Sequence, residues 1–307
     1  MKPTAAIGPH FLRNAHLQMH FCVLLWGFTA ILGKLISLPA VVLVFWRVLI
    51  VSLCLLVWPA VWRRLRAVSR RDLALSVAAG VLLMLHWLTF YGAIKLANAS
   101  VAVTSLALAP VFLAIAEPYL LRQPFVRRDV LLALVAVPGV LLVVGGIPAN
   151  MHEGFALGTL SALFVSVFSV FNKRLTMRVP ALALTAMEMA TAAVVLGVLI
   201  PLWPLVGVAF VLPGAMDLAW LLVLCFACTL LPFVLSIVAL RRISAFSAQL
   251  AVNLEPVYTV AIASLVLGES RQLLWPFYVG VGLLLASVLI NAHLHRIPGA
   301  WQDTPAG

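Results

Sequence analysis

Charged residues are scarce in this sequence, and acidic residues are the scarcest of them. Only 9% of the 307 residues are Asp, Glu, Lys or Arg, and just nine are acidic, whereas ordinary soluble chains carry roughly 25% charged residues. Hydrophobic residues make up 64% of the chain. A water-soluble domain has no use for that much apolar surface. The composition therefore excludes a soluble enzyme or binding module and predicts a protein embedded in a membrane.

Several chemical motifs are also missing. The chain has no phosphate-binding loop of the Walker type, so we expect no direct use of ATP. Its net charge of +11 comes from short loops rather than from a basic face with interleaved aromatics, so we expect no nucleic-acid partner. Cys225 and Cys228 form a CxxC pair inside an apolar run, which favours buried thiols over a zinc or redox site. His16 and His20 have metal-ligand spacing but lack a third ligand, so we expect neither a metal nor another cofactor.

The chain is rich in long, unbroken apolar runs, which predict an all-α integral membrane protein. A helix needs about 20 apolar residues to cross a bilayer, and only helices or closed barrels can face lipid. Because the runs are continuous rather than alternating, we expect helices. We expect ten spans, at residues 17–36 and 40–62, from the basic loop 63–72 to about 95, and at 100–121, 130–146, 154–175, 180–203, 218–240, 244–267 and 273–293.

The basic residues divide unevenly between the two sides of these spans. With the N-terminus inside, sixteen of the twenty Lys and Arg residues fall in cytoplasmic segments, and only Lys34, Lys95 and Arg271 fall at outer ends. Positive charge is retained on the cytoplasmic side of a membrane. We therefore expect a multi-pass protein of the plasma (inner) membrane with both termini in the cytoplasm.

Two stretches of the chain, residues 98–123 and 244–271, are near copies of one another, 146 positions apart without a gap. Both copies carry a proline followed by Val and an aromatic residue in mid-span, at Pro110 and Pro256, and we expect these prolines to act as helix hinges. The duplication predicts four parts of the chain: a cytoplasmic tail (1–16), a first repeat (17–146), a second repeat (154–293) and a cytoplasmic tail (294–307).

An odd number of spans in each repeat has a mechanical consequence. Five spans per repeat would insert the second copy upside down relative to the first, and inverted repeats recur in secondary transporters. Such a protein has two related conformations, each open to one side of the membrane. The repeat therefore favours transport by alternating access.

Four short motifs carry a resemblance to a known family: Pro110-Val111-Phe112, Pro256-Val257-Tyr258, the Leu267-Gly268-Glu269 ending of the second copy, and Phe45-Trp46-Arg47. With these motifs the chain resembles the EamA-type branch of the drug/metabolite transporter superfamily. The first copy departs from the pattern with Leu121-Arg122-Gln123, which we interpret as a topological change that places positive charge in the cytoplasm. The resemblance implies two five-helix repeats and, in most members, export of small metabolites such as amino acids or drugs.

Charged residues inside the expected spans are the sharpest candidates for function, because each costs roughly 2.5–3.5 kcal/mol at a helix centre. Arg47 and Glu188 fall at equivalent positions when Pro39 is aligned with Pro180. They are expected to act as gate or substrate residues, or else to form a structural salt bridge. Glu117 lies near the inner end of its span, where it can simply face headgroups.

Glu255 directly precedes Pro256. A proline frees a backbone carbonyl and bends a helix, so this carboxyl group is expected to face a cavity and exchange protons. The alternative is a carboxyl group that only caps local polar groups.

Aromatic and uncharged polar residues are expected to complete the substrate pocket. Gln249 and Asn253 are four residues apart and so share a helix face. A structural alternative exists, because serines and small residues such as Gly154 and Gly158 also let helices approach closely. The other candidates for substrate contact or coupling are Trp26, His86, Trp87, Tyr91, Ser169 and Asn172.

These patterns together predict a secondary transporter, and no enzyme. We expect an exporter of small organic metabolites, either amino acids or drug-like amphiphiles, with the lipid bilayer as its surroundings and proton coupling as one option. The alternatives are a channel or a non-transporting scaffold, and a membrane-embedded lipid-modifying enzyme, which would need clustered Asp or His residues that the chain lacks. The sequence leaves open whether the protein is a monomer or a homodimer.

Overall fold

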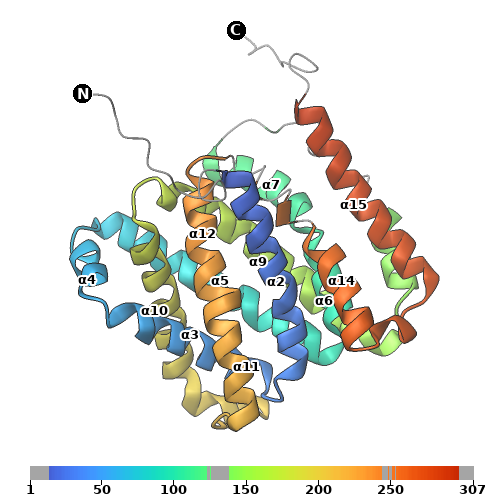
Figure 1. Ribbon diagram of the computed structural model, residues 1–307, viewed down its shortest axis with the longest axis horizontal. Helices are drawn as coiled ribbons and strands as arrows, with labels where there is room; N and C mark the ends of the chain where they lie inside the picture. Colours follow the sequence, from blue (N-terminus) through green and yellow to red (C-terminus); the bar gives the residue numbers. More distant parts are fainter. Residues whose placement is uncertain are drawn as a thin grey trace.

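The protein was analysed as a computed structural model that describes residues 14–122, 125, 138–243, 248, 251–252 and 254–296. In these ranges every regular element is helical and none is a strand (Figure 1), which confirms the all-helical class. The elements are α2 (Ala15–Leu35), α3 (Ala40–Leu56), α4 (Pro59–Leu65), α5 (Arg70–Leu96), α6 (Ala99–Leu106), α7 (Ala109–Leu121), η1 (Ala149–Met151), α9 (His152–Thr176), α10 (Ala181–Leu199), η2 (Ile200–Val206), α11 (Ala215–Cys225), η3 (Phe226–Leu230), α12 (Leu231–Leu240), α14 (Glu255–Val266), η4 (Glu269–Arg271) and α15 (Trp275–Arg296).

Six helical segments are long and apolar enough to cross a membrane: Ala15–Leu35, Arg70–Leu96, Ala99–Leu121, Ala149–Thr176, Ala181–Val206 and Ala215–Leu240. A seventh is added if α3 and α4 form one bent span, and α14 and the first part of α15 are shorter apolar helices. The chain is therefore a multi-pass membrane protein. The total of ten spans stays a prediction, in part because residues 126–137 and 244–247 lie outside the described ranges. The division into four parts also stays a prediction.

The second expected span is not one helix. α3 ends at Leu56, α4 begins at Pro59, and the two helices are bent by 92°. Pro59 has no N–H to donate and disfavours helical backbone at Trp58, which is extended at φ −84° and ψ 116°. The expectation of a continuous helix over residues 40–62 is therefore wrong. The apolar run passes through the bend, so hydropathy alone conceals it.

The two mid-span prolines stand at helix starts. Pro110 is the second residue of α7, and Pro256 is the second residue of α14. A proline is tolerated at such a position because its missing N–H has no partner in the first turn of a helix. The chain thus starts new helices beside both prolines instead of bending one continuous helix. Their role as hinges stays a prediction.

Small residues let α9 approach α5 and α6 closely. A Cβ atom added at Gly154 would lie 2.6 Å from the Cβ of Ala97, and one added at Gly158 would lie 2.8 Å from the Cβ of Ser105. Real Cβ atoms do not approach other atoms this closely, so both positions require glycine. The expectation that these glycines serve close helix packing is confirmed.

Carboxylates tie the two halves of the chain together where α2 ends and α6 begins, which we call the tether end. Glu269 accepts hydrogen bonds from the backbone N–H groups of Ala99 and Ser100 at 3.0 and 2.9 Å and from the Ser100 hydroxyl at 2.7 Å. A carboxylate at a helix N-terminus is favoured by the helix dipole. Asp217 likewise accepts from the backbone N–H and the hydroxyl of Ser37 at 2.8 and 2.6 Å.

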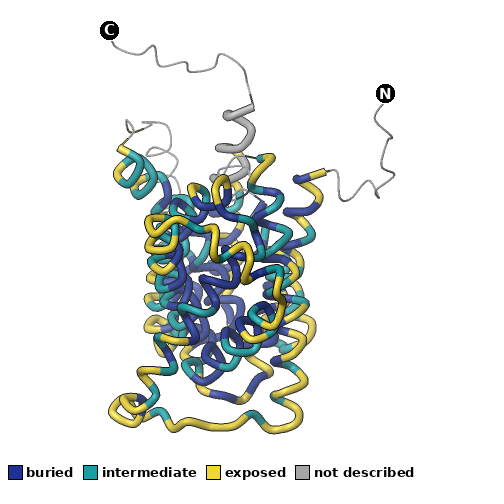
Figure 2. Tube along the Cα trace, turned by 90° about the vertical axis from the view of Figure 1, so that its left-hand side faces the viewer, coloured by how far each residue is buried: buried dark blue, intermediate teal, exposed yellow. Residues whose placement is uncertain are grey.

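The opposite end of the bundle, where α2 begins and α12 ends, is the N-terminal end. There Ala15 and Met19 of α2 pack in one cluster with Ala239 of α12, and the ammonium group of Lys173 donates to the Leu240 carbonyl oxygen. In Figure 2 buried residues fill the interior of the bundle and exposed residues follow its outside. Many of the exposed side chains are large and apolar, as expected for a surface that faces lipid.

The close approach of α9 predicts a clear effect of one methyl group. Gly158→Ala should destabilise the purified protein by about 1–3 kcal/mol, because the new Cβ overpacks against Ser105. Gly282→Ala on α15 is the matched control, since a Cβ there meets no atom within 4 Å. Thermal unfolding in detergent measures both. Equal melting temperatures for the two variants would contradict the packing described for α9.

Candidate substrate cavity

A cavity of about 140 Å³ lies among α2, α3, α5, α9, α12 and the first residue of α14. Apolar and aromatic side chains form most of its wall. An apolar cavity of roughly 150 Å³ can hold benzene, so the space suits a small organic molecule. The polar side chains that line it are Thr29, Arg47, His86, Ser169, Asn172, Ser236 and Glu255.

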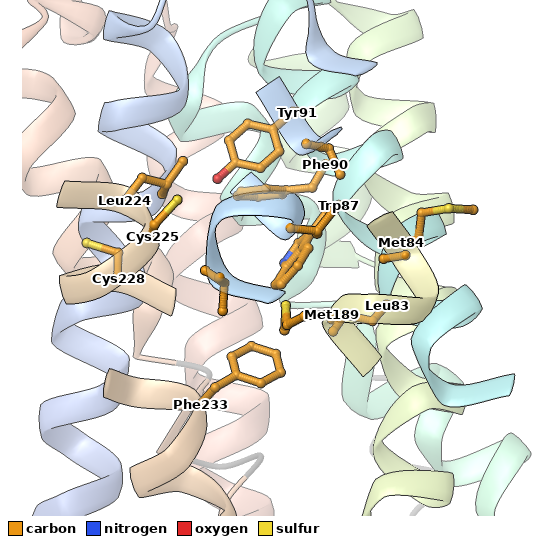
Figure 3. Close-up of a cluster of buried hydrophobic side chains, with 14 of the residues drawn as sticks. Leu83, Met84, Trp87, Phe90, Tyr91, Met189, Leu224, Cys225, Cys228 and Phe233 are labelled. Carbon is orange, nitrogen blue, oxygen red and sulfur yellow. The ribbon is translucent and has the colours of Figure 1, made fainter. Parts of the chain in front are cut away.

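Phe233 of α12 is the centre of the aromatic part of the wall. Its ring centroid lies 5.6 Å from that of Trp87 on α5, and Figure 3 shows both side chains. It also lies 6.3 Å from Trp26 on α2 and 6.4 Å from Phe168 on α9. Each such pair contributes roughly 0.5–1.5 kcal/mol beyond its buried area. One side chain thus joins four helices around the cavity.

Arg47 of α3 brings a buried positive charge to this wall. Its guanidinium carbon lies 3.8 Å from the centroid of the Trp87 ring. Its Nε donates to the Thr229 hydroxyl at 2.7 Å, and its Nη1 donates to the Tyr91 hydroxyl at 2.8 Å. The ion pair between Arg178 and Asp72 does not involve this arginine. Aromatic and hydroxyl groups therefore hold Arg47 there, and no carboxylate of the described residues forms an ion pair with it.

A local irregularity of the backbone positions Thr229. The segment from α11 to α12 contains a π-helical turn at Phe226–Leu230, and such turns often lie at functional sites. The Thr229 hydroxyl donates to the Leu224 carbonyl oxygen at 2.6 Å. Because that bond uses its single proton, the hydroxyl can only accept from Arg47. The turn thus fixes the direction from which Arg47 is held.

Tyr91 is positioned by a glycine on a neighbouring helix. A Cβ added at Gly33 of α2 would lie 2.6 Å from Cε1 of the Tyr91 ring, so glycine leaves the room that the ring occupies. Tyr91 is fully buried and does not line the cavity itself. It contacts Arg47 from outside the cavity wall.

The two candidate carboxyl groups have different surroundings. Glu255, the first residue of α14, is buried and lines the cavity. Glu188 of α10 is fully buried but is not part of the wall, and its carboxyl oxygens have no hydrogen-bond partner among the described residues. The expectation of a salt bridge between Arg47 and Glu188 is wrong, because the guanidinium turns toward Trp87, Tyr91 and Thr229 instead.

His86 is held by the helix across the cavity. Its Nδ1 lies 2.8 Å from the Ser161 hydroxyl and 3.1 Å from the Ser161 carbonyl oxygen, and its ring stacks on Phe90 with centroids 6.0 Å apart. A satisfied, buried histidine of this kind needs no metal. No group of three His, Cys, Asp or Glu residues in the described part of the chain could hold a metal ion.

The structure brings most of the sequence candidates together. Trp26, Arg47, His86, Trp87, Ser169, Asn172 and Glu255 all line the cavity. Tyr91 supports Arg47, Glu188 lies apart, and Gln249 and Asn253 lie outside the described residues. Whether any of them binds substrate stays a prediction.

The sequence reasoning missed Phe233 and Phe168 as wall residues. A signal for Phe233 was present, since the 146-residue register places it on Trp87. The same register relates further wall residues to one another. Four such pairs line the cavity: Trp87 and Phe233, Phe90 and Ser236, Leu106 and Val252, and Ala109 and Glu255.

The cavity extends from the middle of the bundle toward its N-terminal end. Arg47 and His86 lie near the middle of their helices, whereas Met19 lies near the start of α2 and Leu240 is the last residue of α12. None of the wall residues belongs to the Glu269 and Asp217 contacts at the tether end. This cavity therefore does not reach the tether end.

A model of the EamA-like transporter family matches residues 14–145 of the chain and, a second time, residues 152–292. The chain belongs to the EamA-like transporter family. The resemblance carried by the Pro-Val-aromatic motifs is thereby confirmed, and this EamA-like protein is a membrane transporter with a small-molecule substrate. The family is one of transporters rather than of enzymes.

A protein of known crystal structure is similar to this EamA-like transporter in fold. The TM-score is 0.64 at 18% sequence identity, and the match covers 92% of this chain and 97% of that chain. At such an identity the likeness shows the fold alone. A search of curated proteins gives no match.

The cavity predicts which cysteines introduced into α9 would react with a thiol reagent. With Cys22, Cys54, Cys225 and Cys228 replaced by Ala, Ser169→Cys should react with a small methanethiosulfonate roughly tenfold faster than Ser166→Cys, because exposure controls thiol reactivity. Ser166 lies on the same helix but is buried outside the cavity wall. Mass spectrometry of the labelled protein measures both rates. Equally slow labelling would mean that the cavity is not accessible in membranes.

Proposed function

We propose that this protein is a secondary transporter of the plasma membrane that exports small organic metabolites by alternating access, with both termini in the cytoplasm. The observation that carries the proposal is the make-up of the cavity. Equivalent positions of the two repeats line it together, and one such pair, Trp87 and Phe233, is in contact with ring centroids 5.6 Å apart. Contact between equivalent residues is expected near the axis that relates two repeats, where transporters of this plan bind substrate.

The asymmetry between the two ends of the bundle supports alternating access. At the tether end, which the distribution of basic residues predicts to be outside, Glu269 holds Ala99 and Ser100, and we propose that these contacts keep that end closed. The cavity extends toward the other end, which is predicted to be cytoplasmic. The described conformation is then the one that receives a solute from the cytoplasm. Release outside requires these tethers to open.

The wall of the cavity favours a small solute that is partly apolar and carries a polar or charged group. Trp26, Trp87 and Phe233 offer flat apolar faces, while Arg47 and Glu255 offer charges of opposite sign. Amino acids and drug-like amphiphiles both have this character. The limited volume restricts the choice to small members of either class.

Glu255 is the proposed site of proton coupling. Among the described residues that line the cavity, it is the sole acidic one. A carboxyl group that exchanges a proton for a solute allows the inward proton gradient to drive export, because the proton taken up outside is released in the cytoplasm as the next solute binds. Its register partner is Ala109, so only one repeat supplies the group.

Glu255→Gln should abolish gradient-driven transport and leave exchange intact. We would reconstitute the protein in proteoliposomes, supply radiolabelled amino acids and, separately, small amphiphilic amines, and impose a pH gradient. For one proton exchanged, a gradient of about one pH unit supports about a tenfold concentration ratio of the solute. We expect this accumulation in the wild type and its loss in Glu255→Gln.

Glu153→Gln, which changes an exposed carboxyl group at the start of α9, is the control and should behave as the wild type. Gradient-driven accumulation that survives in Glu255→Gln would exclude proton coupling at this residue. The absence of any flux or exchange for every solute would favour a non-transporting scaffold.

A further inference from the structure

The positive charge of Arg47 has no counter-ion of its own in the described structure. Arg47 as a whole residue is 1% exposed, and its guanidinium remains charged at any ordinary pH. Trp87, Tyr91 and Thr229 stabilise it without neutralising it. A buried charge is normally paired, and the described part of the chain places no carboxylate within ion-pair distance of Arg47.

The bonds that Arg47 makes leave donors available. A guanidinium has five N–H donors in a planar fork, and the bonds to Thr229 and Tyr91 use one on Nε and one on Nη1. Arg47 also lines the cavity. The remaining donors are therefore the ones that a ligand in the cavity can meet.

We propose that Arg47 binds a carboxylate group of the transported solute, and that Thr229 and Tyr91 are positioning residues that hold its guanidinium for this contact. The inference rests on the proposed function of the cavity as the substrate site and adds the chemical class of the substrate. A carboxylate accepts two parallel N–H bonds from an arginine fork. The apolar remainder of the solute then lies against the aromatic wall around Phe233.

Charge balance favours a carboxylate over a phosphate group. A single guanidinium supplies one positive charge, and Glu255 shares the same cavity. A doubly charged phosphate would leave one negative charge unmatched in an apolar space and would be repelled by an ionised Glu255. A singly charged carboxylate neutralises Arg47 and leaves Glu255 free to take a proton or a donor group.

The π-helical turn sets the geometry of this anchor. Thr229 lies in the turn and accepts from Nε, while Tyr91 of α5 accepts from Nη1. The two contacts, one from each repeat, stop the fork from rotating about its side chain. Without either contact the charge of Arg47 would remain, but the direction of its free donors would be lost. Arg47 thus supplies the charge, and Thr229 and Tyr91 set the direction of its donors.

Matched probe molecules test the proposal without any assumption about the natural solute. Acetate, benzoate and phenylacetate would be compared with acetamide, benzamide and phenylacetamide, which keep the shape but lose the charge. Isothermal titration calorimetry on the full-length protein in detergent gives the affinity of each probe. For at least one pair, the wild type should bind the carboxylate about tenfold more tightly than the amide, because a charge-assisted fork is stronger than a neutral bond.

Variants assign the preference to Arg47 and its supports. Arg47→Gln should remove the preference for carboxylates. Since this variant changes a buried charge and its folding can suffer, Thr229→Val provides a second test that retains the arginine. It should reduce the preference several-fold while leaving the affinity for the amide unchanged, a pattern that general destabilisation would not produce. Thr185→Val, at a buried threonine of α10 outside the cavity wall, is the control and should keep the full preference.

Three results would overturn the proposal: no binding of any carboxylate probe, equal affinity for carboxylate and amide in every pair, or a preference that survives in Arg47→Gln. Binding is measured here without flux, so the outcome is separate from that of the proposed function. A preference for carboxylates with no transport would count against the transporter and not against the anchor. Transport without a preference for carboxylates would count against the role of Arg47 and not against the transporter.

Discussion

The buried guanidinium of Arg47 is the interaction on which the rest of the cavity depends. An arginine inside a membrane bundle must be solvated by protein, because lipid offers no partner. Here α3 supplies the charge, α5 supplies Trp87 and Tyr91, and the turn before α12 supplies Thr229. Holding one side chain thus fixes three helices relative to one another. The π-helical turn and the glycine at position 33 are the local adjustments that make this possible.

Both repeats contribute residues to this cavity, but equivalent positions carry different side chains. Equivalent positions of the two repeats line it together, yet the register pairs Glu255 with Ala109 and Phe233 with Trp87. Under the proposed function, a symmetric framework would give two related conformations, and the unequal residues would let solute and proton act on one site. The two repeats also differ at the residue that makes the tether contact. Glu269 caps α6 through Ala99 and Ser100, whereas the register places Gln123, which carries no charge, at the equivalent position.

Composition and repeats predicted the parts of this structure that depend on averages over many residues, namely the all-helical class and the family. Individual helix ends were harder, as at Pro59, where an apolar run conceals a 92° bend. Most of the proposed pocket residues do line the cavity. They could be recognised in the sequence because polar groups are costly to bury and therefore stand out in an apolar span. The partner of Arg47 could not be predicted, since Glu188 offers an opposite charge and Thr229 a hydroxyl acceptor, and only packing decides between them. Phe233 was missed because a phenylalanine in an apolar span is unremarkable without the register.

The central claim is that the two ends of the bundle open in alternation, and distances between spin labels test it most directly. One pair would join Leu96 and Leu274 at the tether end, and the other Leu17 and Met177 at the N-terminal end, all exposed residues. Double electron–electron resonance in lipid nanodiscs would follow both pairs as pH and solute are varied. We expect two distances for each pair, with one end widening as the other narrows. A single, unchanging distance at both ends under every condition would contradict alternating access.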